Sequence, residues 1–294
     1  MRYFLENELL KCEFDNHGAE LKSVMTKKDN REYMWYGNGK YWGRSAPVLF
    51  PFVGKLKDLK YTWKGQEYSM GQHGFARDTD FEMISCEGNE MRFLMKSTEE
   101  SKKKYPFDFT LEIVYTLEKT ALNVRWIVTN TGDEDMHFSI GAHPAFLCPV
   151  HGEKDKAGYR LVFKDAEEIH HYGNSRDKGL AMDEDLVLKL ENETAVLTAD
   201  FFDRTTYIVD GHQCQDVILE DPEGKPVVEV TFDAPLFGVW SPEEKNAPFL
   251  CIEPWYGRCD AEDFEGDLSE RAFSNKLAAG EVFDKNYTMT YFEL

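Results

Sequence analysis

The sequence predicts an all-β fold, a sandwich or barrel of antiparallel strands with a few short helices. Short runs of alternating apolar and polar residues recur along the chain, and clusters of turn-forming residues separate them. Aromatic residues, which strands favour, make up 14% of the chain. Helical periodicity is confined to two short segments, which argues against an α/β fold. No linker, low-complexity tract or internal repeat divides the chain, so residues 1–294 are predicted to form a single domain.

The first half of the chain contains an early strand and a clear hairpin. Residues 1–14 (MRYFLENELLKCEF) are expected to form the first strand, and residues 98–106 are expected to hold a turn or two of helix. Residues 109–117 and 121–129 are predicted strands, joined by the tight turn at 118–120. In the first of these strands every second residue is apolar, which is the period of a half-buried strand: Phe109, Leu111, Ile113, Tyr115 and Leu117.

In the second half of the chain, predicted strands are again separated by turn-forming residues. Residues 136–140 (MHFSI) are predicted to be a strand that leads into a corner. Residues 217–220 and 226–232 flank the sequence DPEGK and predict a second hairpin, because proline presets φ and glycine accepts a positive φ. Residues 268–278 (LSERAFSNKLA) are expected to form a short helix that ends before Gly280.

Charge and composition exclude several classes of partner. The formal net charge of −20 disfavours binding to nucleic acid and to anionic membranes. No apolar run approaches the roughly 18 residues of a membrane-spanning helix, and the N-terminal segment lacks the apolar core of a signal peptide. We therefore expect a cytoplasmic protein with reduced thiols, since the six cysteines form no CxxC pair. No P-loop, Rossmann or GxSxG motif is present, and no cofactor is expected.

Three segments break the alternating pattern, and each holds a titratable residue beside glycine or proline. His73 lies in GQHGFARD, where the glycines allow close approach to a ligand. His143 lies in SIGAHPAF, where the following proline holds it extended at a strand end. Glu253 is expected to end the apolar strand FLCI beside Trp255, so that partial desolvation would suit it to general-base chemistry. The simpler alternatives are a histidine at an ordinary corner and a glutamate neutralised by Arg258.

Other polar residues give weaker signals. His137 could share a strand face with His143, but two histidines without a third ligand at suitable spacing do not predict a zinc site, and no metal is expected. His170 and His171 are expected in a surface loop. Lys55 alternates with an apolar neighbour and could face a pocket.

Taken together, these segments resemble the aldose 1-epimerase (galactose mutarotase-like) family, and within it the LacX-like branch. The resemblance runs nearly end to end, through GAELKS, APVLFPFVGKLKD, QHGFARD, NTGDEDMHFSIGAHPAF, CIEPWYG and LAAGE. It implies a large antiparallel β-sandwich, often called a supersandwich, with the site in a cleft on one sheet.

The family resemblance also implies roles for individual residues. The histidine of the HP motif, a general acid, falls on His143, and the glutamate before Pro-Trp, a general base, falls on Glu253. The histidine of the HG motif, which holds the sugar, falls on His73. Further sugar-binding positions are assigned to Arg77, Lys55, Arg44 and Trp255. Here Ala145 and Phe146 follow the HP pair where better-known galactose mutarotases have Tyr-Phe, and Asp233 is the candidate for their sugar-binding aspartate.

The implied function is mutarotation of an aldose by a monomer or homodimer, with Glu253 charged and His143 protonated because each charge favours the other. A hexose-6-phosphate 1-epimerase is the alternative, since Arg44, Lys55, Lys57 and Arg77 could gather into a cationic patch. A sugar-binding protein without catalysis is a second alternative. A glycosidase is disfavoured, because only one carboxylate lies in a site-like setting.

Overall fold

The computed structural model describes residues 1–175, 177–203 and 205–293, and within them the fold is almost entirely antiparallel β-sheet. A nine-stranded sheet has the order β17-β14-β19-β20-β24-β10-β9-β8-β7. Its strands, in chain order, are β7 (Glu82–Glu87), β8 (Glu90–Lys96), β9 (Phe109–Glu118), β10 (Ala121–Asn130), β14 (Arg160–Phe163), β17 (Thr194–Val196), β19 (Asp216–Glu220), β20 (Pro226–Phe232) and β24 (Val282–Tyr291).

An eight-stranded sheet faces one part of the nine-stranded sheet. Its order is β16-β15-β18-β21-β22-β12-β4, with β13 also paired to β22. Its strands are β4 (Val48–Leu49), β12 (Ile140–Ala142), β13 (Ala145–Leu147), β15 (Glu168–Asn174), β16 (Ala181–Lys189), β18 (Tyr207–Val209), β21 (Leu236–Trp240) and β22 (Phe249–Tyr256). Contacts of Phe237 with Phe163 and Phe232, and of Tyr256 with Trp126, join the two sheets.

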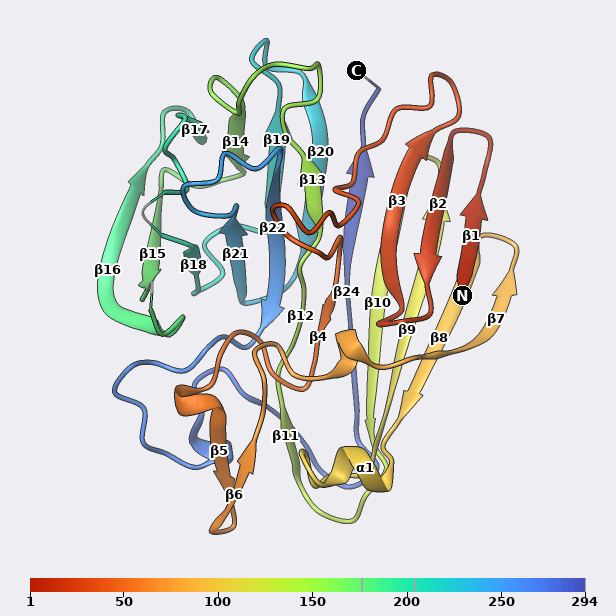
Figure 1. Ribbon diagram of the computed structural model, residues 1–294, viewed down its shortest axis with the longest axis vertical. Coiled ribbons are helices and arrows are strands. Elements are labelled where there is room, and N and C mark those ends of the chain that lie inside the picture. The colour runs from red at the N-terminus through yellow and green to blue at the C-terminus, as the bar shows by residue number, and fades with distance from the viewer. Residues whose placement is uncertain (176, 204, 294) are drawn as a thin grey trace.

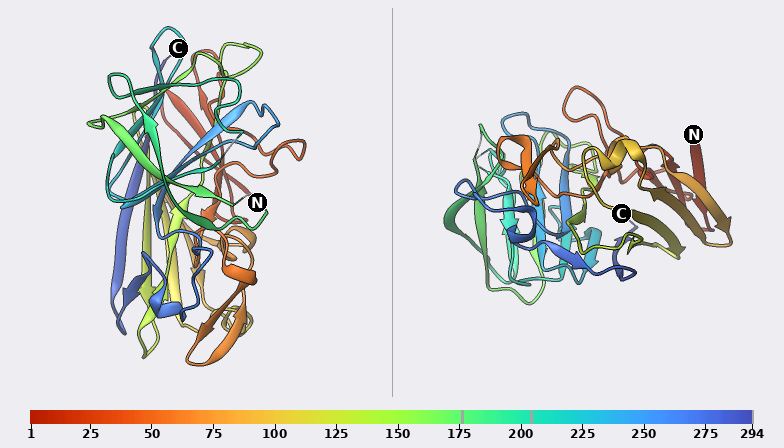
Figure 2. Two further views of the ribbon diagram at one scale, coloured as in Figure 1. Left: turned by 90° about the vertical axis from the view of Figure 1, so that its left-hand side faces the viewer. Right: turned by 90° about the horizontal axis from the view of Figure 1, so that it is seen from below.

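A three-stranded sheet covers the other part of the nine-stranded sheet, beside the eight-stranded one (Figure 1). It consists of β1 (Arg2–Glu6), β2 (Leu10–Asp15) and β3 (Glu20–Thr26). Phe14 packs on Tyr115 of β9, and the Tyr115 hydroxyl donates to the Ala19 carbonyl oxygen at 2.8 Å. Seen from the side, β24 and its neighbours form the back layer, with β22 and β1–β3 in front (Figure 2). Apolar residues of all three sheets form one contiguous core.

The remaining elements are short. Two small sheets pair β5 (Lys60–Trp63) with β6 (Gln66–Ser69), and β11 (Met136–Phe138) with β23 (Asn275–Leu277). The single turn of α-helix, α1, spans Glu99–Lys102, and single 3₁₀ turns lie at Lys57–Leu59, Ala76–Asp78 and Leu268–Glu270. In the part of the chain that the structure describes, no helix has the length and apolar character needed to cross a membrane.

The predicted fold class is confirmed, and so are both predicted hairpins. β9 pairs with β10 through a register in which Glu118 lies opposite Ala121, and β19 pairs with β20 across the turn that contains Gly224 at φ 82°. All five alternating apolar residues of β9 are buried. The six cysteines are unpaired, and Cys86 is the exposed one among them. The segment 98–106 forms only α1, with Thr98 as its N-cap.

Three predicted elements differ from the structure. Residues 136–140 do not form one strand: β11 ends at Phe138 in a two-stranded sheet, and β12 begins at Ile140 in the eight-stranded sheet. Residues 1–14 form two strands, because the Asn7 side chain accepts from the backbone N–H groups of Leu9 and Leu10 and closes a turn. The segment 268–278 is not a helix. Asp267 caps a single 3₁₀ turn, Phe273 takes φ 58°, and residues 275–277 become β23 by pairing with β11. Pairing with a distant strand outweighs the local helical preference.

Candidate active site

The strands β12 and β13 pair with the same edge of β22 and leave a gap between them. The register is the same on both sides of the gap, and continuing it places His143 directly opposite Glu253. Pro144 and Pro254 follow these residues and have no N–H to donate, so the ladder cannot run through this point. At this break in the ladder the side chains of His143 and Glu253 meet.

The position of Glu253 corrects the sequence prediction. Glu253 does not end its strand, because β22 continues to Tyr256. The other edge of β22 stays paired here, with Gly238 opposite Glu253 and Phe237 opposite Pro254. The carboxylate therefore projects from the middle of a central strand. Its expected alternative partner, Arg258, instead donates to the Cys259 carbonyl oxygen.

His143 and Glu253 form a close, buried pair. His143 Nε2 lies 3.3 Å from Glu253 Oε2, and the two residues are 7% and 1% exposed. Neither Glu253 Oε2 nor His143 Nδ1 makes a hydrogen bond within the described chain. A buried polar atom without a partner costs about 1–3 kcal/mol. A ligand that bonds to these atoms recovers this free energy.

Burial sets the charge of this pair. It lowers the pKa of His143 to about 3, with Arg77 acting in the same direction. It raises the pKa of Glu253 well above its usual range, and the indole N–H of Trp255 only partly opposes this shift. Burial therefore acts against the charged glutamate and protonated histidine that the sequence analysis expects, because desolvation opposes their mutual attraction.

Two tryptophans hold the His143 ring. Trp42 stacks on the imidazole with ring centroids 4.6 Å apart, and Trp240 meets it edge-on at 5.3 Å. Trp42 belongs to the loop 37–45, which follows β3, and Trp240 ends β21. These two contacts fix the orientation of the imidazole ring, and its Nε2 edge faces Glu253.

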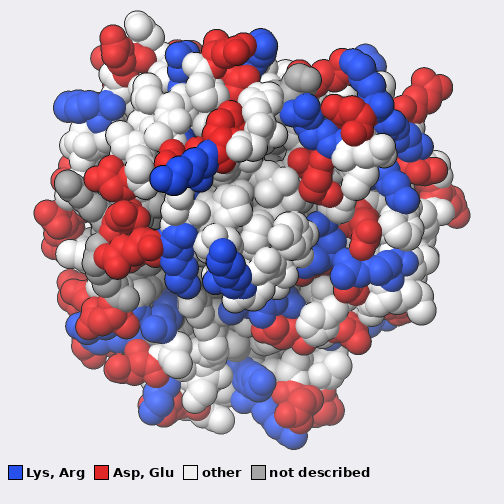
Figure 3. Space-filling view, turned by 45° about the horizontal axis from the view of Figure 1, so that its top comes forward, with Lys and Arg blue, Asp and Glu red and all other residues white. Residues whose placement is uncertain are grey.

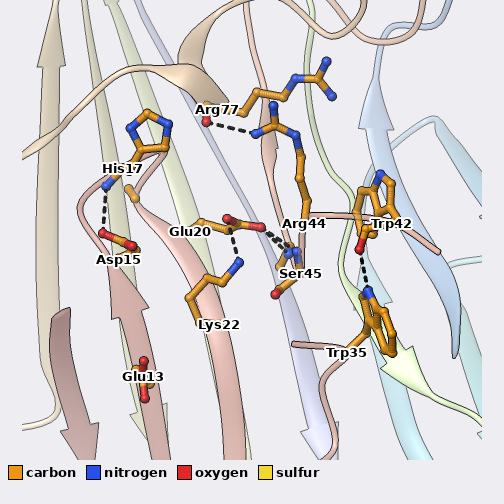
Figure 4. Close-up of polar contacts among 12 residues, drawn as sticks. Glu13, Asp15, His17, Glu20, Lys22, Trp35, Trp42, Arg44, Ser45 and Arg77 are labelled. Carbon is orange, nitrogen blue, oxygen red and sulfur yellow. Dashed lines mark hydrogen bonds and ion pairs between the residues drawn. The ribbon is translucent and has the colours of Figure 1, made fainter. Parts of the chain in front are cut away.

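The loop 37–45 is fixed by buried hydrogen bonds (Figure 4). The Trp42 carbonyl oxygen accepts from the Trp35 indole N–H at 2.8 Å. The Glu20 carboxylate, at the start of β3, accepts from the backbone N–H groups of Ser45 and Ala46 at 2.6 and 3.0 Å. Glu20 therefore anchors the loop that carries Trp42.

Trp255 reaches the same site because two neighbouring residues are glycine. It lies on the same face of β22 as Glu253, two residues away. A Cβ at Gly238 would come within 2.4 Å of the Trp255 ring, and one at Gly141 within 2.6 Å. Any side chain at these two positions would displace the indole.

His73 is held by its own backbone geometry. It takes φ 66°, its N–H donates to the Gly54 carbonyl oxygen, and its Nδ1 accepts from the Gly54 N–H at 3.0 Å. Burial and the neighbouring His143 and Arg77 lower its pKa well below the usual value. The neutral ring therefore carries its proton on Nε2. Its centroid lies 5.6 Å from that of His143.

A cavity of about 310 Å³ lies in front of these residues. Arg77 lines it and donates from Nη2 to the Gln72 carbonyl oxygen. Its buried Nε lies 3.8 Å from Asp78 Oδ2 and makes no hydrogen bond with the described residues. Asn174 lines it as well, and its buried Oδ1 makes no hydrogen bond with the residues that the structure describes. The polar or aromatic lining residues are Trp42, Gln72, His73, Arg77, His143, Asn174, Thr206, Trp240, Glu253 and Trp255.

Sequence reasoning selected five residues of this lining and missed the others. His73, Arg77, His143, Glu253 and Trp255 converge on the cavity. The missed residues include Trp42, Trp240, Asn174 and Thr206. The only sequence signal of Trp42 and Trp240 is the general abundance of aromatic residues, and no pattern singles out Asn174 or Thr206.

Other candidates lie outside the cavity lining. Lys55 lines a neighbouring hollow together with Lys57, and Arg44 pairs with Asp78 at 2.7 Å in a further hollow. Of the four residues of the expected cationic patch, Arg77 alone lines the cavity, although Arg44 lies beside it and donates from Nη1 to the Arg77 carbonyl oxygen at 3.2 Å. Asp233 pairs with Lys285 at the surface at 3.0 Å.

The remaining histidines also lie elsewhere. His137 packs against Trp63. His170 and His171 lie on strand β15, not in the predicted loop, because residues 168–174 pair with β16. His170 forms ion pairs with Glu168 and Asp185, and His171 is buried against Tyr207.

Comparisons with known proteins agree with this architecture. A sequence model of the family described as aldose 1-epimerase matches residues 1–287. The plasmid protein LacX of Lactococcus lactis subsp. lactis is 31% identical over 97% of this chain and 98% of its own length.

Solved structures give the same result. A galactose mutarotase related enzyme from Lactobacillus acidophilus is 35% identical, with a TM-score of 0.93 over 100% of this chain and 98% of that chain. A galactose mutarotase-like protein from Lactobacillus casei is 29% identical, with a TM-score of 0.91 over 99% of this chain and 100% of that chain.

Proposed function

Because the chain belongs to the aldose 1-epimerase family, we propose that it interconverts the α and β anomers of an aldose by acid–base ring opening and reclosure. The observation that carries this proposal is the pairing of His143 with Glu253 across the gap in the β22 ladder. Both residues keep polar atoms without partners at the wall of a cavity. A hemiacetal offers the hydroxyl and ring oxygen that such a pair would bind.

The reaction needs two proton movements. Glu253 takes the proton of the C1 hydroxyl while His143 gives a proton to the ring oxygen, and the C1–O5 bond breaks to leave an aldehyde. Rotation about the C1–C2 bond and the reverse transfers then give the other anomer, so no proton is gained or lost. Each positioned group contributes about 10²–10⁴-fold to the rate.

The neutral buried pair already contains the proton that this mechanism requires. A protonated Glu253 with a neutral His143 has the same number of protons as a carboxylate with an imidazolium. Moving one proton between the two side chains converts the first form into the second. Hydroxyl groups of a bound sugar stabilise the carboxylate by hydrogen bonding. The stacked Trp42 ring favours the imidazolium, since an aromatic face attracts a cation.

The surrounding residues suit the sugar. The His73 ring lines the cavity, with its Nε2 3.2 Å from the Gln72 side-chain amide, and Asn174 presents an acceptor that has no hydrogen bond within the described residues. The rings of Trp42, Trp240 and Trp255 supply apolar surface for the C–H faces of a pyranose. Together they orient the C1 end of the sugar toward His143 and Glu253.

A phosphorylated aldose is the second candidate substrate, and Arg77 favours it. Its guanidinium lines the cavity, and its buried Nε makes no hydrogen bond within the described chain. Burial lowers its pKa to about 10, which still leaves it charged near neutral pH. A guanidinium binds phosphate through paired N–H groups. We expect Arg77→Gln to weaken turnover of a sugar phosphate more than turnover of the free sugar if phosphate is recognised here.

The test is anomer interconversion, followed by polarimetry or NMR, with glucose, galactose and glucose 6-phosphate. Wild-type protein should accelerate it for at least one of these sugars. Glu253→Gln and His143→Asn should each lower turnover at least about a hundredfold while the protein stays folded. Asp233→Asn, at the surface, is the matched control. Near-normal turnover by either site variant refutes the pair, and sugar binding without acceleration identifies a binding protein instead.

A further inference from the structure

A third ligand-type side chain lies beside the His143–Glu253 pair. Cys251 and Glu253 project from the same face of β22, since they are two residues apart. The Cys251 sulfur, a His143 ring nitrogen and a Glu253 carboxylate oxygen all lie within 4.8 Å of one another. All three residues are buried, and Cys251 is unpaired. The proposed mutarotation uses the histidine and the glutamate but gives the thiol no role.

These three donors match the chemistry of one metal in particular. Thiolate, imidazole and carboxylate are the ligands of Zn²⁺, and three protein ligands with one open position are typical of accessible zinc sites. Two ligands bonded at about 2.0–2.2 Å to a tetrahedral ion lie roughly 3.3–3.6 Å apart. His143 Nε2 and Glu253 Oε2 lie at 3.3 Å. Because both residues line the cavity, a metal ion reaches them from that side.

We propose that Zn²⁺ binds to Cys251, His143 and Glu253 and thereby blocks the acid–base pair. Binding takes up the imidazole nitrogen and the carboxylate oxygen that would move protons, so the ion acts as an inhibitor. The thiol proton leaves on ligation, as does the carboxyl proton where Glu253 is protonated, and the metal keeps its oxidation state. The fourth position faces the cavity and takes water or a sugar hydroxyl.

The surroundings distinguish this inhibitory site from a resident metal centre. A zinc-bound histidine normally donates its other ring N–H to a carboxylate or carbonyl group, and such partners are worth about 10–100-fold in affinity. His143 Nδ1 has no hydrogen-bond partner within the described chain. We therefore expect reversible binding that a strong chelator removes. Mg²⁺ prefers octahedral oxygen ligands, so it should not compete.

The test measures Zn²⁺ binding to the whole protein by competition with a chromophoric chelator. Wild type should bind one ion per chain, and Cys251→Ala and Cys251→Ser should each bind at least about tenfold more weakly. Cys259→Ala is the matched control, because Cys259 is a second buried thiol at the cavity wall and should bind Zn²⁺ as wild type does. Both Cys251 variants are measured, so that a packing defect in one of them does not by itself account for weaker Zn²⁺ binding. Absence of binding by wild type, or equal binding by the Cys251 variants, overturns the proposal.

A second readout links the site to catalysis and rests on the proposed mutarotation. Zn²⁺ should inhibit anomer interconversion, EDTA should restore it, and the Cys251 variants should keep their turnover and resist inhibition at least about tenfold better. Inhibition that is equal in wild type and in the Cys251 variants contradicts the site. Because chelator competition needs no turnover, failure of the proposed function would leave the metal site testable.

Discussion

At the scale of single residues, the site depends on polar atoms whose partners are missing within the protein. Glu253 Oε2, His143 Nδ1, Arg77 Nε and Asn174 Oδ1 are buried without hydrogen bonds. Most buried polar groups in folded proteins find partners. Their concentration around one cavity indicates a surface that is shaped for a polar ligand at a cost in stability.

The cost of burying Glu253 predicts a pH dependence of stability. Its pKa in the folded state is raised above the ordinary value of 4.5, so between pH 4.5 and the raised pKa the folded state binds more protons than the unfolded state. Stability is therefore lost as pH rises through this window. Gln at this position stays neutral at every pH. The free energy of unfolding of Glu253→Gln should therefore rise relative to that of wild type by at least about 1 kcal/mol from pH 5 to pH 8.

Urea unfolding at the two pH values measures this gain. Glu87→Gln, on the exposed edge strand β7, serves as the control and should show no comparable pH-dependent difference. A difference between wild type and Glu253→Gln that is the same at pH 5 and pH 8 would contradict a raised pKa.

At the scale of elements, a loop and an interrupted strand build the site together. The gap between β12 and β13 sets His143 opposite Glu253, and the loop 37–45 brings Trp42 onto the imidazole. The anchor of this loop is Glu20, a buried carboxylate that accepts two backbone N–H groups and pairs with Lys22 at 3.1 Å (Figure 4).

Removing this anchor should affect both stability and turnover. Glu20→Ala leaves two buried N–H groups without acceptors, which should lower the free energy of unfolding by about 2–4 kcal/mol. Turnover should fall as well, because Trp42 is no longer held against His143. Glu13→Ala is the matched control on the adjacent strand, where Glu13 forms a partly exposed ion pair with Arg2. Unchanged urea unfolding of Glu20→Ala would show that the carboxylate does not anchor the loop.

At the scale of the whole molecule, two front sheets share one back sheet and one core. Phe14 of β2 and Phe237 of β21 belong to the same apolar cluster as Tyr115 and Trp126 of the back sheet. Acidic and basic side chains are interspersed on the face shown in Figure 3, so the net charge of −20 does not form a single acidic field there. The shared core connects regions that are far apart in the sequence.

This shared core predicts cooperative unfolding, which would establish the single domain expected from the sequence. Neither front sheet can separate without exposing apolar surface of the back sheet, so all three should unfold together. Differential scanning calorimetry should show one transition, with the van't Hoff enthalpy equal to the calorimetric enthalpy. Two resolved transitions would instead divide the chain into separate folding units.

The amino-acid sequence by itself determined the fold class and the hairpins, because alternation and turn chemistry are local properties. It also identified His73, His143 and Glu253, since each stands beside glycine or proline where the alternation breaks. Residues 268–278 show where a local pattern fails, because pairing of β23 with β11 overrides it.

The tertiary structure alone decided how these residues are brought together. The register of β22 with β12 and β13 sets His143 against Glu253, and no local pattern contains a register between distant strands. The packing of the loop 37–45 added Trp42. The same packing excluded water from the pair, and desolvation is a property of the assembled fold. That is why the sequence could name the histidine and the glutamate but not the protonation state in which they stand.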